Sequence, residues 1–221
     1  MPGLLRNRSL TLAMFALFAL SLAGMSLAGL RHHNEEQRAH GQAPVGYGAY
    51  LASGAFVEAV FETWESEFLQ MGLYVLLTAF LYQQGSAESK DPDQPAAVDA
   101  DARGQRDKRG APGPVRRGGL ALTLYEHSLT LALLTLFVLS FLLHAAGGAR
   151  AYSADQLAHG GQAVSTLGYL TTARLWFESF QNWQSEFLSI GALVVLSILL
   201  RQEGSPESKP VPAPHSATGE G

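Results

Sequence analysis

The chain of 221 residues contains no cysteine. Disulfide bonds, thiolate metal sites and cysteine nucleophiles are therefore excluded. Charged residues make up only 15% of the chain, and its formal net charge of −4 argues against a nucleic-acid-binding protein, because such proteins usually present a basic face to phosphates. The sequence also lacks a phosphate-binding glycine loop, a His-Glu-x-x-His pattern and a nucleophile elbow. We therefore expect no catalytic residues, no cofactor and no resident metal.

The apolar residues gather in four blocks, and the chain repeats itself at a fixed offset of 119 residues. The clearest matches are Ser9–Ala13 with Ser128–Ala132, the Trp-x-Ser-Glu-Phe-Leu motif of Trp64–Leu69 with Trp183–Leu188, and the Gly-Ser-x-Glu-Ser-Lys motif of Gly85–Lys90 with Gly204–Lys209. A period of this length indicates duplicated structural units. We predict two tandem copies of one helix-loop-helix unit.

Two uncharged runs begin the copies, Ser9 to Leu30 and Ser128 to Ala149, the second interrupted only by His144. Each reaches about 33 Å as a helix, enough to cross a bilayer core of about 30 Å. A cleaved signal peptide is the alternative for the first run, but the run is long for one and its internal twin cannot be one.

The second helix of each copy has too short an apolar run to cross a membrane alone, so it must extend upstream. We expect it to begin after an N-cap near Ser53 in the first copy and Thr172 in the second. Its apolar and aromatic residues then share one helical face, with Glu58, Glu62 and Glu65 off that face. The fold class predicted is an all-α integral membrane protein with four transmembrane helices.

The expected organisation is a first two-helix membrane repeat (1–86), a disordered cytoplasmic linker (87–119), a second two-helix membrane repeat (120–209) and a disordered tail (210–221). The linker is rich in Pro, Gly, Asp and Arg and lacks an apolar period. Lysine and arginine concentrate at the termini, including Arg6 and Arg8, and in the linker. The positive-inside rule therefore puts both termini in the cytoplasm. The linker could bind anionic lipid, although nearby aspartates favour a solvated segment.

The candidate functional residues lie in the repeated Trp-x-Ser-Glu-Phe-Leu motif: Glu67, Glu186, Trp64, Trp183, Ser66 and Ser185. Glu67 and Glu186 recur in both copies, whereas Glu62 and Glu65 are matched by Gln181 and Gln184. A carboxylate within the apolar region would be a proton or cation site. The alternative is an interfacial acid beside a tryptophan, bonded to the neighbouring serine.

Histidines offer weaker candidates. His144 stands near the outer end of its apolar run, and in a membrane we expect Glu186 at the same depth. One interpretation is therefore a histidine-carboxylate pair, and the other is an interfacial hydrogen bond of the histidine. A cluster of His32, His33, Glu35, Glu36 and His40 has metal-ligand chemistry, but only His40 recurs, as His159, and helical spacing spreads these groups over several faces. Gly24, Gly72 and Gly191 are expected at close helix contacts, and Gly85 and Gly204 at helix ends.

On the duplicated Trp-x-Ser-Glu-Phe-Leu and Gly-Ser-x-Glu-Ser-Lys motifs, nearly the whole chain resembles a family of small bacterial membrane proteins that is a domain of unknown function. The resemblance implies the bacterial cytoplasmic (inner) membrane and supplies no activity or site. We expect a non-enzymatic multi-pass protein that acts through helix packing and partner contacts, with the lipid bilayer and either a second copy or another membrane protein. The alternative is a small ion or proton channel or transporter using Glu67 and Glu186.

Overall fold

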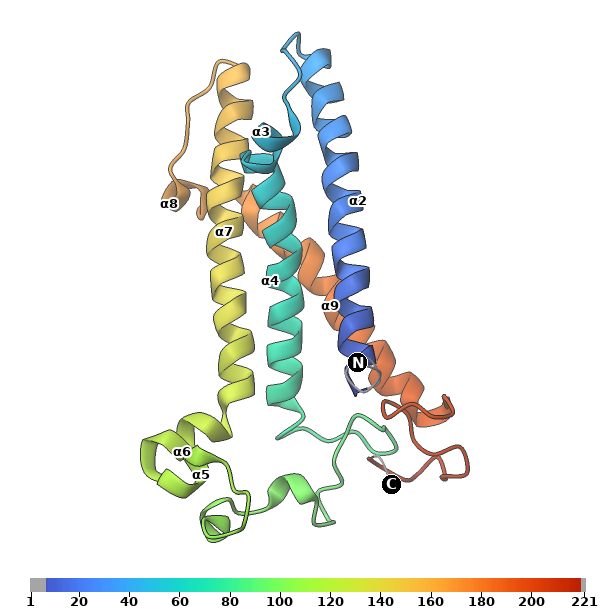
Figure 1. Cartoon of the computed structure of the whole chain (residues 1–221). Helices are drawn as coiled ribbons and strands as arrows, with labels where there is room; N and C mark the ends of the chain where they lie inside the picture. Colours follow the sequence, from blue (N-terminus) through green and yellow to red (C-terminus); the bar gives the residue numbers. More distant parts are fainter. Residues whose placement is uncertain (1–6, 220–221) are drawn as a thin grey trace. The chain divides into compact units, whose positions relative to one another are not determined.

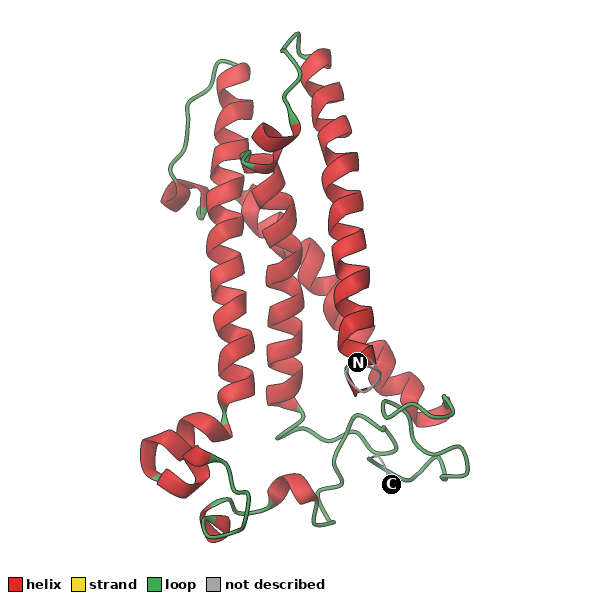
Figure 2. Cartoon of the chain, in the orientation of Figure 1, coloured by secondary structure: helices red, strands yellow, loops and turns green. Residues whose placement is uncertain are grey.

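The computed structural model describes residues 7–219, and every regular element in that range is helical (Figure 2). The long helices are α2 (Ser9–Ala39), α4 (Gly54–Leu77), α7 (Ser128–Ala158) and α9 (Ala173–Leu199) (Figure 1). Short α-helices are α3 (Tyr47–Leu51), α5 (Gly113–Arg117), α6 (Gly119–Glu126) and α8 (Thr166–Tyr169), with 3-10 turns at Ala97–Asp99 and Arg103–Gln105. Arg6, which contributed to the predicted orientation, lies outside the described residues, as do the outer ends of the first repeat and the tail.

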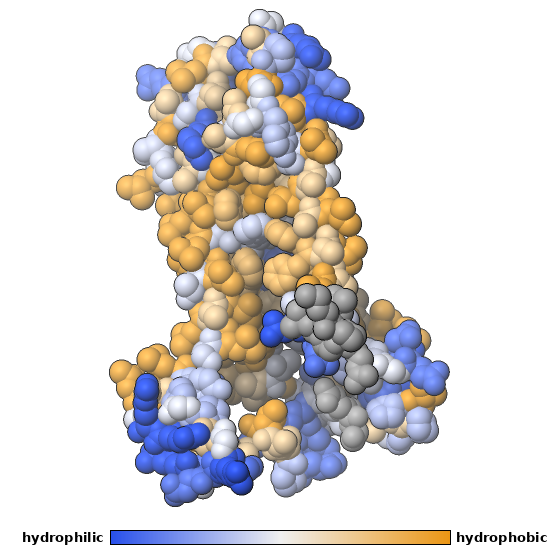
Figure 3. Space-filling model, viewed as in Figure 1, coloured by the Kyte–Doolittle hydropathy of each residue, from blue (hydrophilic) through white to orange (hydrophobic). Residues whose placement is uncertain are grey.

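Three helices, α2, α7 and α9, are long and apolar enough to span a membrane. Their large hydrophobic side chains are mostly exposed, for example Leu10 and Phe15 on α2 and Leu188 on α9. Figure 3 shows this as orange helix surfaces with hydrophilic residues gathered near helix ends. Such surfaces suit lipid rather than water, and together with the three candidate spans they suggest a multi-pass membrane protein. α4 carries four glutamates, Glu58, Glu62, Glu65 and Glu67, and is not among the helices that are long and apolar enough to span a membrane.

The second helices begin where the sequence predicts. The Thr172 hydroxyl accepts a hydrogen bond from the Leu175 N–H, which caps α9, and the Ser53 hydroxyl accepts one from the Phe56 N–H at the start of α4. The predicted ends were wrong: α4 ends at Leu77 and α9 at Leu199, several residues before Gly85 and Gly204. Those glycines instead have positive φ, 83° and 78°, within later turns.

The chain divides into two compact units. Unit 1 runs up to Val60 and includes Leu143–Thr171, and unit 2 consists of Phe61–Leu142 and Thr172 onward. In each unit, segments of both predicted copies come together. The division therefore does not follow the predicted repeat boundaries, which stay predictions.

Unit 1 contains two loops tied to helices in the same way. Asn34 on α2 bonds both the N–H and the carbonyl of Val45 through its side chain. Ser153 on α7 bonds both backbone groups of Val164 in the same way. Ser153 and Val164 stand 119 positions after Asn34 and Val45. These bonds satisfy loop backbone groups that would otherwise need water. Each loop then enters its short helix, α3 or α8, in a fixed position.

Close backbone approach in unit 1 depends on glycine. A Cβ added to Gly54 of α4 would lie 2.7 Å from the carbonyl oxygen of Gly147 on α7. Likewise, a Cβ on Gly148 would lie 2.8 Å from Cζ of the buried Tyr169. Backbone atoms and a buried ring leave no room for a larger residue, so these glycines set the spacing.

In unit 2, Gly72 of α4 meets Leu134 of α7, 3.1 Å from where its Cβ would lie, as a packing role predicts. Gly24 in unit 1 and Gly191 in unit 2 have open space at the same test position, so the packing interpretation was wrong for them. A small residue permits a close helix contact without requiring one.

The two Gly-Ser-x-Glu-Ser-Lys motifs form the same turn in unit 2. Ser89 accepts a hydrogen bond from the Gln83 N–H at 2.8 Å, and Ser208 accepts one from the Gln202 N–H at 2.9 Å. The buried ammonium of Lys209 donates to carbonyl oxygens of Gly85, His215 and Ala217. The described part of the tail is thereby attached to the first motif.

Candidate functional site

Three glutamates of α4 lie at positions i, i+4 and i+7, which places Glu58, Glu62 and Glu65 on one face of the helix. Glu65 is 0% exposed and Glu58 is 7% exposed, while Glu62 is half-buried. We call these three residues the carboxylate stripe. The stripe faces protein, in contrast to a water-soluble helix, which turns its acids outward.

Glu65 is held in unit 2 by two donors from α9. The Ser179 hydroxyl donates to its Oε1 at 2.7 Å, and the Trp183 indole N–H donates to the same oxygen at 3.3 Å. Ser179 is also fully buried. The Trp183 ring is positioned by Phe180 and Phe137, with centroid distances of 5.4 and 6.2 Å. A carboxylate in the interior therefore has oriented polar partners on the neighbouring helix.

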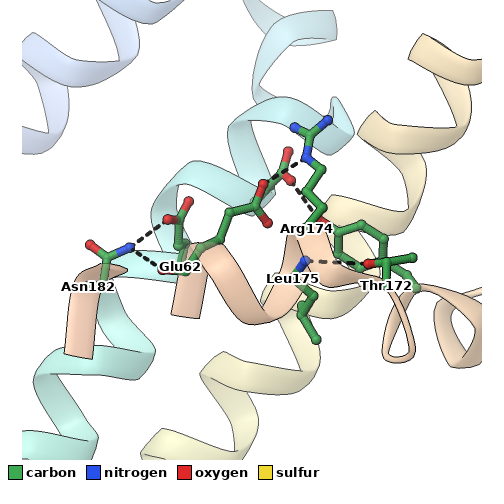
Figure 4. A network of polar contacts seen from close by, with 8 residues as sticks. Glu62, Thr172, Arg174, Leu175 and Asn182 are labelled. Atoms are coloured by element: carbon green, nitrogen blue, oxygen red, sulfur yellow. Dashed lines mark hydrogen bonds and ion pairs between the residues drawn. The ribbon is translucent and has the colours of Figure 1, made fainter. Parts of the chain in front are cut away.

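Glu62 is bonded to the same helix one turn away. The side-chain nitrogen of Asn182 donates to Glu62 Oε1 at 2.5 Å and to the Glu178 carbonyl oxygen at 3.0 Å. Figure 4 shows the Asn182 amide directed at Glu62, with the Thr172 cap and Arg174 at the N-terminal end of α9. Arg174 donates to Glu178 Oε1 at 2.7 Å. Polar groups on α9 thus follow the face of α4 that carries the stripe in unit 2.

The unit 1 end of the stripe has different neighbours. The Tyr169 hydroxyl donates to Glu58 Oε1 at 3.2 Å. A ring nitrogen of His144 lies within 4.8 Å of a Glu58 carboxylate oxygen, and His144 is 0% exposed. A carboxylate, an imidazole and a phenol therefore gather in an interior position. Carboxylate and imidazole both exchange protons and both bind cations.

The predicted acids Glu67 and Glu186 stand elsewhere in unit 2. Glu67 is exposed and Glu186 is half-buried, and their charges are near enough to interact. Neither belongs to the stripe. Their recurrence in both copies drew attention to them, while the acids that are most buried occur in the first copy alone.

The other predicted residues divide in the same way. Trp183 takes part in the Glu65 site, whereas Trp64 is half-buried with its ring against Phe61 at 5.1 Å. Ser66 is buried and donates to the Thr63 carbonyl, and Ser185 is exposed and donates to the Asn182 carbonyl. The serines therefore bond their own helices, and neither bond reaches Glu67 or Glu186.

The α2 cluster is spread over separate contacts. His32 pairs with Glu36 at 3.4 Å, and His33 meets Gln37 at 3.3 Å. The His40 and His159 rings lie edge to face with centroids 5.9 Å apart. Each ring also bonds a backbone carbonyl of its own helix through Nδ1.

The helical periodicity of the sequence carried a signal for the carboxylate stripe, but the recurrence of Glu67 and Glu186 in both copies outweighed it. The sequence placed Glu58, Glu62 and Glu65 on the polar face of the helix. In a soluble protein that face meets water, whereas in a membrane bundle it meets other helices. His144 stood out as the one interruption of its apolar run. Ser179, Asn182 and Tyr169 gave no separate signal, because their roles depend on which helix lies opposite.

A helical interior with polar groups on α4 and α9, and no motif for covalent chemistry, says little about lineage by itself. A family model described as a domain of unknown function (DUF6766) matches residues 1–220. The chain belongs to that family. The predicted membership of a family of unknown function is thereby confirmed, and it brings no activity with it. No curated protein and no solved structure matches the chain.

Proposed function

We propose that the chain is a four-span protein of the bacterial inner membrane, with both termini cytoplasmic and two tandem copies of a two-helix unit. The fourth span is α4, whose 24 residues would extend about 36 Å. Three of its four acids do not oppose this assignment, because the stripe faces protein and not lipid; the exposed Glu67 is the exception. Exposed leucines on the other spans are left to contact lipid, a second copy or another membrane protein.

Matching local structures support the two-copy arrangement. α2 and α7 are both 31 residues long, and they begin at Ser9 and Ser128. The loop attachments at Val45 and Val164 and the two Gly-Ser-x-Glu-Ser-Lys turns match as well. The copies differ in the stripe, because the second copy has glutamines where Glu62 and Glu65 stand in the first.

Within this membrane protein, we infer that Glu65 and Glu62, the members of the carboxylate stripe in unit 2, bind and pass protons or small cations, with Glu65 as the central group. The observation that carries this function is full burial of Glu65 beside oriented neutral donors. A charge at mid-membrane costs about 3 kcal/mol, so acids in such positions are rare and are typical of ion pathways and proton relays. Glu62 lies about one turn away on the same face of α4 in unit 2.

The competing function is structural: the stripe would fasten α4 to α9 within a scaffold that acts through packing and partner contacts. The hydrogen bonds from Ser179 and Trp183 favour this function too, because they would hold the two helices together whether or not an ion binds. The two functions differ in whether the negative charge of Glu65 is required.

Reconstitution into proteoliposomes separates them. Glu65→Gln retains the size and the hydrogen-bond acceptor of the side chain but removes its charge. We expect proton or cation flux in the unaltered protein, loss of flux in E65Q and retained flux in the matched variant E67Q/E186Q. Flux that is unchanged in E65Q, or lost only in E67Q/E186Q, would reject the assignment to Glu65. Absence of flux in correctly folded, unaltered protein would favour the structural function.

A further inference from the structure

A basic segment stands directly before α6 in unit 2. Residues 103–117 contain six exposed basic side chains and one acid, Asp107. The basic residues are Arg103, Arg106, Lys108, Arg109, Arg116 and Arg117. This density of positive charge is unusual in a chain whose net charge is negative, and it calls for an anionic partner.

The basic segment has a folded base. Ala111, Val115 and Leu122 form a small buried cluster, which joins α5 to α6. The Arg116 side chain donates from Nε to the Ala111 carbonyl at 2.8 Å. The apolar cluster holds the basic side chains of this segment next to α6.

The turn between α5 and α6 gathers charge further. Gly118 has a φ of 67°, which suits glycine, and a Cβ built on it would lie 2.8 Å from Cζ of Arg106. The Arg106 guanidinium is therefore brought beside the end of α5, where Arg116 and Arg117 are found. Three cationic groups thus surround a single turn.

The position of this turn relative to the membrane follows from connectivity. Only His127 separates α6 from α7, which is long and apolar enough to span a membrane. α6 exposes Leu120, Leu124 and Tyr125, residues that suit the boundary between headgroups and acyl chains. A short, mostly apolar helix joined to a span by one residue has to lie close to the membrane surface.

We propose that the basic segment binds anionic phospholipid headgroups at the surface of the membrane that α7 spans. Charge complementarity and the continuity of α6 with α7 select this partner. The aspartates upstream of the segment compete with lipid headgroups for its basic side chains only in part, since Asp99 already pairs with Lys90 at 2.5 Å. The proposal requires α7 to span the membrane and is independent of any function of the carboxylate stripe.

The test uses the full chain in lipid nanodiscs with one reporter cysteine, Thr123→Cys, on the exposed surface of α6, labelled with an environment-sensitive fluorophore. Phosphatidylglycerol is titrated into phosphatidylcholine discs. The variant R116Q/R117Q is compared with R31Q/R38Q, which removes the same charge from exposed positions at the other end of the predicted topology. Each basic contact contributes about fivefold in affinity, so R116Q/R117Q should need at least about five times more anionic lipid for the same response.

The proposal predicts a response to phosphatidylglycerol that R31Q/R38Q retains and added salt weakens. A reporter that is insensitive to the anionic lipid, or a response equal in all three proteins, would overturn it. Stronger inhibition by inorganic phosphate than by chloride at equal ionic strength would also overturn it, because it would indicate a site for free phosphate. A monodisperse elution profile of R116Q/R117Q in detergent checks that the variant remains folded.

Discussion

The hydroxyl of Ser179 donates to the carboxylate of Glu65 at 2.7 Å, and both side chains are fully buried. This bond joins α4 to α9 within unit 2. It combines the two properties on which the proposed function depends, an acid removed from solvent and a polar partner that fixes its orientation. We expect the same bond to contribute measurably to stability.

Replacing Ser179 by alanine should destabilise the protein by about 1 to 3 kcal/mol, because a buried carboxylate oxygen loses a donor. The measurement is thermal unfolding of the purified protein in detergent. Ser185→Ala is the matched control, since its hydroxyl is exposed and bonds a carbonyl of its own helix. Equal unfolding temperatures for S179A and S185A would show that the bond to Glu65 contributes nothing.

Substitutions of two helical glycines should have opposite effects. In Gly54→Ala the new Cβ would meet backbone atoms of α7, at 2.7 Å from the Gly147 carbonyl oxygen, and backbone cannot easily move aside. We expect a lower unfolding temperature for G54A. Gly191→Ala meets open space and should stabilise its helix by up to about 1 kcal/mol. A more stable G54A would contradict the close crossing of α4 and α7 in unit 1.

The proposed orientation can be tested with reporter cysteines, because the chain has none of its own. In intact cells, a membrane-impermeant thiol reagent should label Gln42→Cys, in the loop after α2, and spare Ala100→Cys, in the segment before α5. The reason is the concentration of lysine and arginine at the termini and between the copies. Labelling of A100C with protection of Q42C would reverse the topology.

The sequence was informative where a property belongs to one helix. Apolar length located α2 and α7, and hydroxyl side chains located the starts of α4 and α9 at Ser53 and Thr172. The ends of these helices were misplaced, because the positive-φ glycines Gly85 and Gly204 serve later turns. Boundaries governed by one capping bond are therefore easier to predict than those with several available turn residues.

Properties that involve two helices were harder to predict. Glu65 is exceptional only because Ser179 and Trp183 lie opposite it. The repeated motif marked Trp183 but not Ser179, and it did not indicate that either residue faces Glu65. Recurrence favoured Glu67 over Glu65, since recurrence reports what both copies share. A site that exists in one copy is missed by that criterion. The polar face of α4 was visible, but its meaning depends on whether lipid or water surrounds the helix.

Infrared difference spectroscopy of the protein in bilayers tests the central claim most directly. A pH step, or addition of sodium or potassium ions, should change a carboxyl band that is absent in E65Q and retained in E67Q. That result would assign proton or cation binding to the buried Glu65. A difference spectrum of E65Q identical to that of the unaltered protein would contradict the account and leave Glu65 as a structural bond between α4 and α9.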